Sequence, residues 1–120
     1  MADEHICSGD PLTFAKKVNI GLRQSKADYV IIASNDIYVS EGYAEAMLKC
    51  YEHDKCGVAT VLSEQFHEKT RDLIEEGFFG GLWMVSRECL NKVGLLDETF
   101  INCFEDSDYW VRVKLAGITF

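Results

Sequence analysis

Residues 27–36 read Ala-Asp-Tyr-Val-Ile-Ile-Ala-Ser-Asn-Asp, an apolar run that ends abruptly in polar residues. A short run that is apolar on both faces and rich in β-branched residues is typical of a central strand in a parallel sheet, with helices covering both faces. Ligands of such sheets bind beyond the carboxyl ends of the strands. The sequence therefore predicts a ligand site at the end of this strand, where Asn35 offers an amide and Asp36 a carboxylate.

Helical and strand patterns alternate on both sides of this strand. Short connections between alternating elements indicate an α/β fold, a mostly parallel sheet flanked by helices, in a single domain over residues 1–120. We expect Asp10 and Pro11 to open the first helix and Ser40 to cap the second. The expected helices cover residues 12–25, 40–53, 86–93 and 105–116, and the other expected strands cover residues 57–62 and 78–85.

The chain is acidic, with 12 Lys and Arg residues against 20 Asp and Glu residues and a formal net charge of −8. This charge argues against binding of nucleic acid or anionic membranes, because the mean field repels both and no basic run is visible. The five cysteines are odd in number and scattered, and the first residues lack a signal-peptide pattern, which favours a cytoplasmic location. No apolar run approaches the roughly 20 residues that a membrane-spanning helix needs.

Two further groups of residues are candidates for chemistry. Glu105, Asp106 and Asp108 open the last helix, where acids either complement the helix dipole or supply a general base that accepts a proton from a hydroxyl. The segment Gly80-Gly81-Leu82-Trp83 is either a strand bulge with a core tryptophan or a floor on which a sugar stacks against the indole. Neither pattern decides between its two interpretations.

The order of several motifs carries more information than any one of them. The most specific part is Gly-x-x-Asp-Glu-x-Phe at residues 94–100, followed by Glu-Asp-x-Asp-x-x-x-Arg at residues 105–112. With the other motifs, from about residue 12 to the C-terminus, the chain resembles the family 2 glycosyltransferases of the GT-A fold. The matching segments are residues 14–21, 27–36, 80–81, 93–100 and 104–117.

The resemblance implies an inverting, hexosyltransferase-like enzyme that moves a sugar from a nucleotide-diphosphate donor to a hydroxyl of a saccharide or other acceptor. It implies Mg²⁺ or Mn²⁺ at the diphosphate, because these cations share ligands with substrate phosphates. By analogy the metal ligand is Asp36, the nucleotide-sugar site includes Asn19, Asn35 and Asp36, the acceptor site includes Gly80, Gly81 and Trp83, and the catalytic pair is Glu105 and Asp106, with Asp106 as general base.

The sequence also departs from the family pattern. Ser34 stands where a full Asp-x-Asp motif has its first carboxylate, and nothing before residue 12 resembles the family's nucleotide-binding strand and loop. We therefore expect a truncated GT-A domain with weak or no activity alone, whose strand at residues 29–33 keeps an open edge. Such an edge favours a homo-oligomer, most simply a symmetric dimer. The alternative is a non-catalytic remnant that self-associates or binds a partner.

Overall fold

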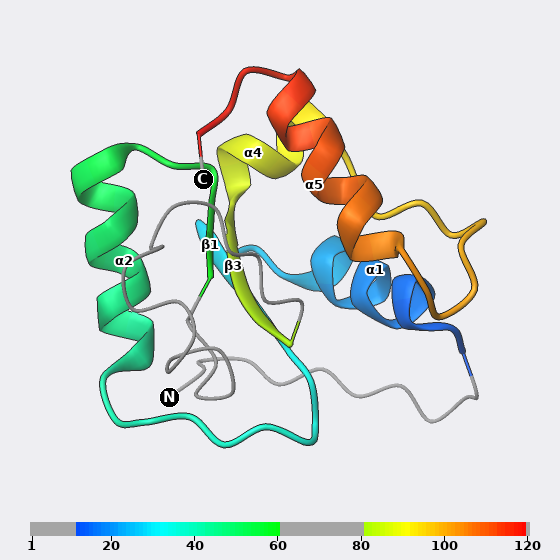
Figure 1. Cartoon of the computed structure of the whole chain (residues 1–120), viewed down its shortest axis with the longest axis horizontal. Helices are drawn as coiled ribbons and strands as arrows, with labels where there is room; N and C mark the ends of the chain where they lie inside the picture. Colours follow the sequence, from blue (N-terminus) through cyan, green and yellow to red (C-terminus); the bar gives the residue numbers. More distant parts are fainter. Residues whose placement is uncertain (1–11, 61–80, 120) are drawn as a thin grey trace, which may run out of the picture.

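A computed structural model describes residues 12–60 and 81–119, which build one small sheet with helices on both faces (Figure 1). The expected helices and strands at these residues form, with bounds that shift by a few positions. In chain order the elements are α1 (Phe14–Gln24), β1 (Tyr29–Ala33), α2 (Tyr43–Asp54), β2 (Val58–Thr60), β3 (Leu82–Ser86), α4 (Arg87–Val93) and α5 (Glu105–Leu115).

The sheet has the strand order β1-β3-β2, and β3 is antiparallel to both neighbours. The prediction of a mostly parallel sheet is therefore wrong for the described strands. Since β1 and β2 both oppose β3, they run in the same direction, as expected for two strands joined by a crossover helix, here α2. The reversed strand β3 lies between them. An apolar run reads alike in either orientation, so its pattern could not reveal this.

The strand expected in the centre of the sheet lies at its edge. All five residues of β3 are buried, whereas β1 has one buried residue, Ile32, and ends in the exposed Ala33. Hydrogen bonds continue the pairing past both ends of β1, from Arg87 N to the Asp28 carbonyl at 2.7 Å and from Ser34 N to the Gly81 carbonyl at 2.8 Å. The other side of β1 has no strand beside it among the described residues.

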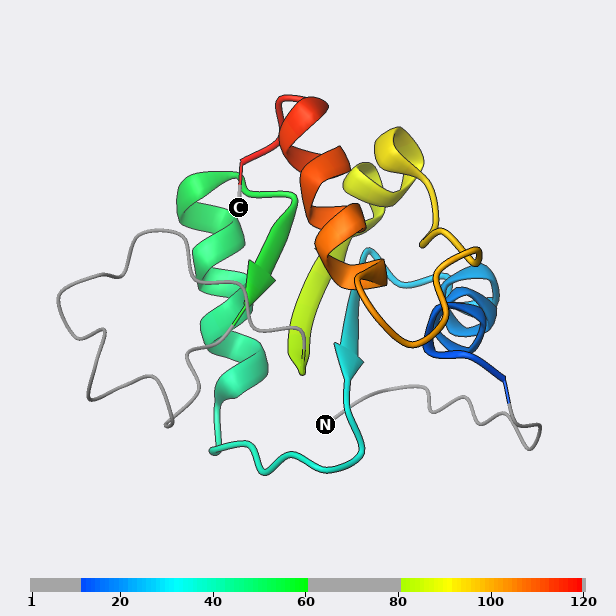
Figure 2. The ribbon, with the colours of Figure 1, turned by 45° about the vertical axis from the view of Figure 1, so that its right-hand side comes forward.

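Helices cover both faces of the sheet (Figure 2), and each face carries its own apolar layer. On one face α1, α4 and α5 pack around Trp83 and Val85, and α2 covers the other face with Met47 against Leu82 and Met84. Side chains alternate between the faces along each strand, which explains how one apolar run serves both layers. No helix within residues 12–60 and 81–119 is long and apolar enough to cross a membrane.

Local capping residues set most helix ends. The Ser86 hydroxyl accepts from Cys89 N at 3.1 Å to start α4, and Gly94 ends that helix with a positive φ of 90°, as predicted. The first helix instead has Thr13 as its cap, not Asp10, and α2 begins after Gly42, not at Ser40. Residues 61–80, which include parts of the strands expected at residues 57–62 and 78–85, lie outside the described residues.

Candidate functional site

Asn19 joins the first helix to the Gly-x-x-Asp-Glu-x-Phe segment. Its Nδ2 donates to the Leu96 carbonyl at 2.8 Å and to Glu98 Oε1 at 2.9 Å, and its Oδ1 accepts from Leu96 N at 3.0 Å. Both amide hydrogens are therefore used, and the side chain is fully buried. Asn19 thus acts as a clamp within the fold, and its role in donor binding stays a prediction.

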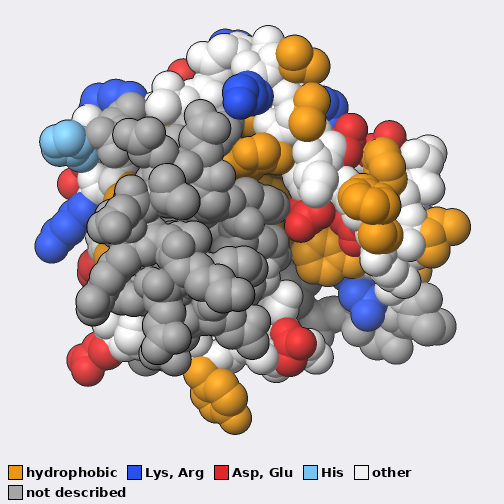
Figure 3. Space-filling model, viewed as in Figure 1, with side chains coloured by type: hydrophobic (Ala, Val, Ile, Leu, Met, Phe, Trp, Pro, Cys, Tyr) orange, Lys and Arg blue, Asp and Glu red, His pale blue; other side chains and the backbone are white. Residues whose placement is uncertain are grey.

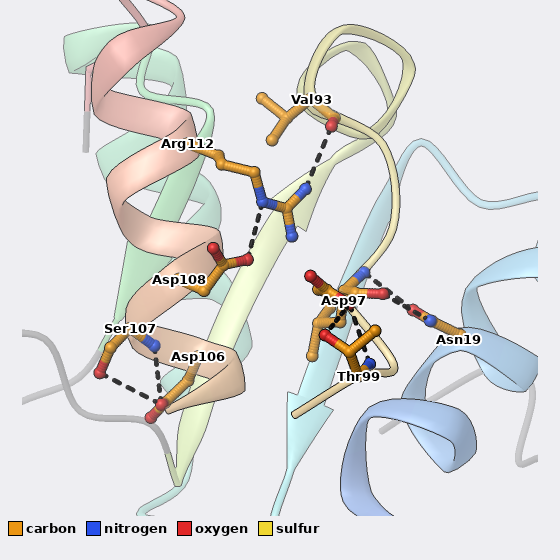
Figure 4. Close-up of polar contacts among 9 residues, drawn as sticks. Asn19, Val93, Asp97, Thr99, Asp106, Ser107, Asp108 and Arg112 are labelled. Atoms are coloured by element: carbon orange, nitrogen blue, oxygen red, sulfur yellow. Dashed lines mark hydrogen bonds and ion pairs between the residues drawn. The ribbon is translucent and has the colours of Figure 1, made fainter. Parts of the chain in front are cut away.

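Arg112 joins α5 to the end of α4, directly before this segment. Figure 4 shows its guanidinium between Asp108, one turn earlier on α5, and the end of α4. Its Nε donates to Asp108 Oδ2 at 2.8 Å and its Nη1 to the Val93 carbonyl at 3.3 Å. The same cation lies 5.0 Å from the ring centre of Tyr109. Asn19 thus holds the first motif against α1, and Arg112 holds α5, which carries the second motif, against the residue directly before the first motif.

The first turn of α5 carries the predicted catalytic acids, Glu105 and Asp106. Asp106 is half-buried, and its Oδ1 accepts from Ser107 N at 2.7 Å, while its second oxygen has no hydrogen bond to a described residue. Glu105 is only 5% exposed, and its Oε2 has no hydrogen-bond partner within the described residues. Buried carboxylate oxygens are rarely left without a donor, so this turn is a candidate site for a polar ligand.

Further unpartnered polar atoms lie on the same side of α5. The Tyr109 hydroxyl and Arg112 Nη2 are buried and, like Glu105 Oε2, lack hydrogen-bond partners in the part of the chain that the structure describes. Positions 105, 109 and 112 follow the spacing that places residues on one face of a helix. Burial also raises the pKa of Tyr109, whose hydroxyl lies beside Cys89, so the phenol stays neutral at physiological pH.

The loop before α5 holds its backbone in an unusual conformation. Asn102 and Phe104 have positive φ angles of 55° and 68°, which residues other than glycine seldom adopt. Asn102 is anchored, because its Oδ1 accepts from Phe14 N at 2.9 Å, whereas Phe104 is 66% exposed. Figure 3 shows hydrophobic side chains gathered over α5 and this loop. Strained backbone of this kind is concentrated at functional sites, which supports a site at this end of α5.

The end of β1 lies at the same end of the sheet as this turn. Ser34 bonds to Gly81 across the β1–β3 ladder, and Trp83, two residues along β3, packs on Tyr109 of α5 with ring centres 5.6 Å apart. These contacts bring together the carboxyl end of β1, the start of β3 and α5. Asn35 and Asp36 follow β1 as exposed residues, and no described residue is hydrogen-bonded to either side chain.

Gly81 and Trp83 are the residues of the predicted acceptor site that the structure describes. Trp83 is 1% exposed and belongs to the core around Val85 and Tyr109, so its indole offers no face on which a sugar could stack. The alternative interpretation of this residue, a core tryptophan, is the one that the structure favours. Gly81 is half-buried at the sheet end, and Gly80 lies outside the described residues.

Asp36 provides a single carboxylate, which suits a divalent cation only where substrate and water supply its other ligands. The described residues contain no group of three or more His, Cys, Asp or Glu side chains that could hold a metal ion by themselves. A cation such as Mg²⁺ is often held by one or two carboxylates together with substrate phosphates and water. Asp36, exposed beyond the strand end, has the right chemistry for that arrangement.

The hydrogen bonds of the loop after α4 lower the pKa of two carboxyl groups. The pKa of Glu98 lies below its ordinary value because Asn19 donates to it and the Arg23 guanidinium lies 3.3 Å away. The pKa of Asp97 is lowered because the backbone N–H and the hydroxyl of Thr99 both donate to it. Both groups therefore favour the charged form in the folded chain.

Because these pKa values are lowered in the folded chain, we expect the free energy of unfolding to fall at acidic pH. The stabilisation is complete above the ordinary carboxyl pKa values and is lost as the pH falls through the lower folded-state values. The free energy of unfolding, measured by urea titration between about pH 5 and pH 2, should therefore fall less steeply in Glu98→Gln than in the unchanged chain. Glu41→Gln, an exposed acid before α2, is the control. Parallel pH profiles for Glu98→Gln and the unchanged chain would contradict this account.

Comparison of the chain with protein-family models, with curated proteins and with solved structures finds no match. Any functional assignment therefore depends on the motifs and on the geometry described above.

The sequence did not point to two residues that organise this site. Asn102 has no motif around it, and only its position, 88 residues from Phe14, shows it to be a tertiary anchor. Arg112 was visible only as the last residue of the Glu-Asp-x-Asp-x-x-x-Arg motif, and the sequence predicted no partner for it. Its second bond, to the Val93 carbonyl, depends on the packing of α5 against α4.

Proposed function

We propose that this chain acts in the transfer of a sugar from a nucleotide-diphosphate donor to a hydroxyl acceptor, with inversion at the anomeric carbon. The observation that carries the proposal is the first turn of α5, where Glu105 and Asp106 keep carboxylate oxygens without partners among the described residues. The hydrogen bonds of Asn19 and Arg112 support it, because they fix the first motif against α1 and fix α5, which carries the second motif, against the end of α4.

The roles of the residues follow from their surroundings. Asp106 accepts the proton of the acceptor hydroxyl while that oxygen bonds to the anomeric carbon and the bond to the diphosphate breaks. Its bond from Ser107 N holds one oxygen, so the other oxygen is the one that faces the hydroxyl. Glu105 lies beside Asp106 at the start of α5, and its unpartnered oxygen is buried. Asp36 would hold a divalent cation, which would supply positive charge for the departing diphosphate.

The donor half of this proposal is tested by binding. We expect nucleoside diphosphates and nucleotide sugars to bind only with Mn²⁺ or Mg²⁺. The chain is acidic, so the charge of the diphosphate is neutralised by a cation that bridges it to the protein. Asp36→Ala should abolish the metal-dependent heat of binding in calorimetry. Asp28→Ala removes an exposed acid at the opposite end of β1 and is the matched control.

Two outcomes of this measurement count against the assignment. Binding of equal strength with and without the divalent cation would remove the metal from the proposal. Metal-dependent binding that survives in Asp36→Ala would move the cation to another residue.

A further inference from the structure

The hydrogen-bond pattern of β1 shows which of its backbone groups face β3 and which face away from it. Asp28 and Ser34 both bond to the β3 side, and in an antiparallel ladder alternate residues do so. Val30 and Ile32 therefore also face β3, and the N–H and C=O groups of Tyr29, Ile31 and Ala33 point away from it. No strand covers this edge within residues 12–60 and 81–119. The opposite edge strand, β2, is only three residues long.

The open edge of β1 lacks the usual protection against pairing. Edge strands of monomeric proteins commonly carry Lys, Pro or a bulge that prevents another strand from adding. The Tyr-Val-Ile-Ile-Ala sequence of β1 contains neither residue, and its pairing with β3 runs without a bulge from Tyr29 to Ala33. An added strand would thus find a straight, uncharged edge.

We propose that a second copy of this chain pairs antiparallel along β1, about a two-fold axis at Ile31. In that register Ile31 bonds to its own counterpart, and Tyr29 bonds to the second copy's Ala33, so that every outward group of the strand is satisfied. The two sheets become one continuous sheet. This inference is independent of the proposed sugar transfer, since it needs neither donor nor metal.

The charges that flank β1 favour a second copy over an unrelated strand. Lys26 precedes the strand and Asp36 follows it, and both are exposed. Antiparallel pairing about Ile31 brings Lys26 of each copy to the end where Asp36 of the other emerges. The backbone around Lys26 is fixed, because the Arg87 side chain donates to the carbonyls of Ser25 and Ala27. The edge is therefore complementary to itself in charge as well as in hydrogen bonding.

Hydrogen exchange and sedimentation test this pairing together. Sedimentation velocity without divalent cations, which would compete for Asp36, should show a concentration-dependent dimer. Backbone amide exchange measured by NMR should show that protection of Tyr29, Ile31 and Ala33 rises with concentration, whereas Val30 and Ile32 are protected throughout.

A monomer whose outward amides are protected at every concentration would show that the edge is covered within one chain. A monomer whose outward amides exchange freely would show that a second copy does not pair with β1. Either result overturns the proposal.

The variants that test the pairing lie at exposed positions, so that the substitutions leave the fold intact. Ala33→Pro removes an outward N–H and places its ring toward the second copy, so the dimer should weaken by about tenfold or more, while Ala33→Val keeps the N–H and should stay dimeric. Lys26→Glu should also weaken the dimer, and adding Asp36→Lys should restore it by exchanging the two charges. Equal dimer strength in Ala33→Pro and Ala33→Val, or no rescue by the charge exchange, would exclude the proposed register.

Discussion

Asp106→Asn should lower the rate of sugar transfer by about a hundredfold or more, the usual scale for loss of a general base. The reason is local, because an amide has the size of the carboxylate but cannot accept the proton of the attacking hydroxyl. The fold should be retained, since the side-chain oxygen of asparagine can still accept from Ser107 N. The measurement is transfer from a nucleotide sugar to a hydroxyl acceptor, with donor affinity measured in parallel by calorimetry.

A helix-dipole role for Asp106 makes a different prediction. Glu45→Gln is the matched control, because Glu45 is an exposed acid in the first turn of α2, on the other face of the sheet, and the substitution removes the same charge. If the acids at residues 105–108 only complement the dipole of α5, both variants should lose a little stability and neither should lose activity. Transfer at the unchanged rate in Asp106→Asn would therefore return this residue to a structural role.

Asn19→Ala should destabilise the folded chain by roughly 2–4 kcal/mol. The substitution deletes three hydrogen bonds and leaves the buried N–H and C=O of Leu96 without their partner, which costs more than the loss of an exposed pair. Chemical denaturation should show a lower midpoint with an unchanged slope, because the surface exposed on unfolding stays nearly the same. Asn91→Ala, at an exposed position of α4, is the control and should shift the midpoint little.

The Asn19 variant also separates a clamp from a ligand contact. A residue that binds the donor directly would, when replaced, weaken donor affinity without a comparable loss of stability. Asn19 is buried and its amide is fully hydrogen-bonded, so we expect Asn19→Ala to lower the stability of the fold more than the affinity for the donor. A change in stability below about 0.5 kcal/mol, the size expected for an ordinary surface substitution, would contradict the clamp.

Local patterns in the sequence were sufficient for most of the elements. The strand at residues 29–33 forms with the predicted bounds, and α4 lies between its predicted caps, Ser86 and Gly94. These features depend on neighbours within a few positions, such as the Ser86 hydroxyl that accepts from Cys89 N. The acids that open α5 were found in the same way, and the structure places them in the first turn of that helix.

The sequence alone thus determined which segments form helices and strands, which residues are apolar, and which acids stand at helix and strand ends. Only the tertiary structure decided that β3 runs antiparallel between β1 and β2, that Trp83 is covered by Tyr109, and that Asn19 is used up by Leu96. The physical reason is that hydrophobic periodicity and capping report the contacts of a residue with its near neighbours in the chain. Strand direction, the covering of an indole and the partners of a buried amide depend on groups that are distant in sequence, and packing brings them together.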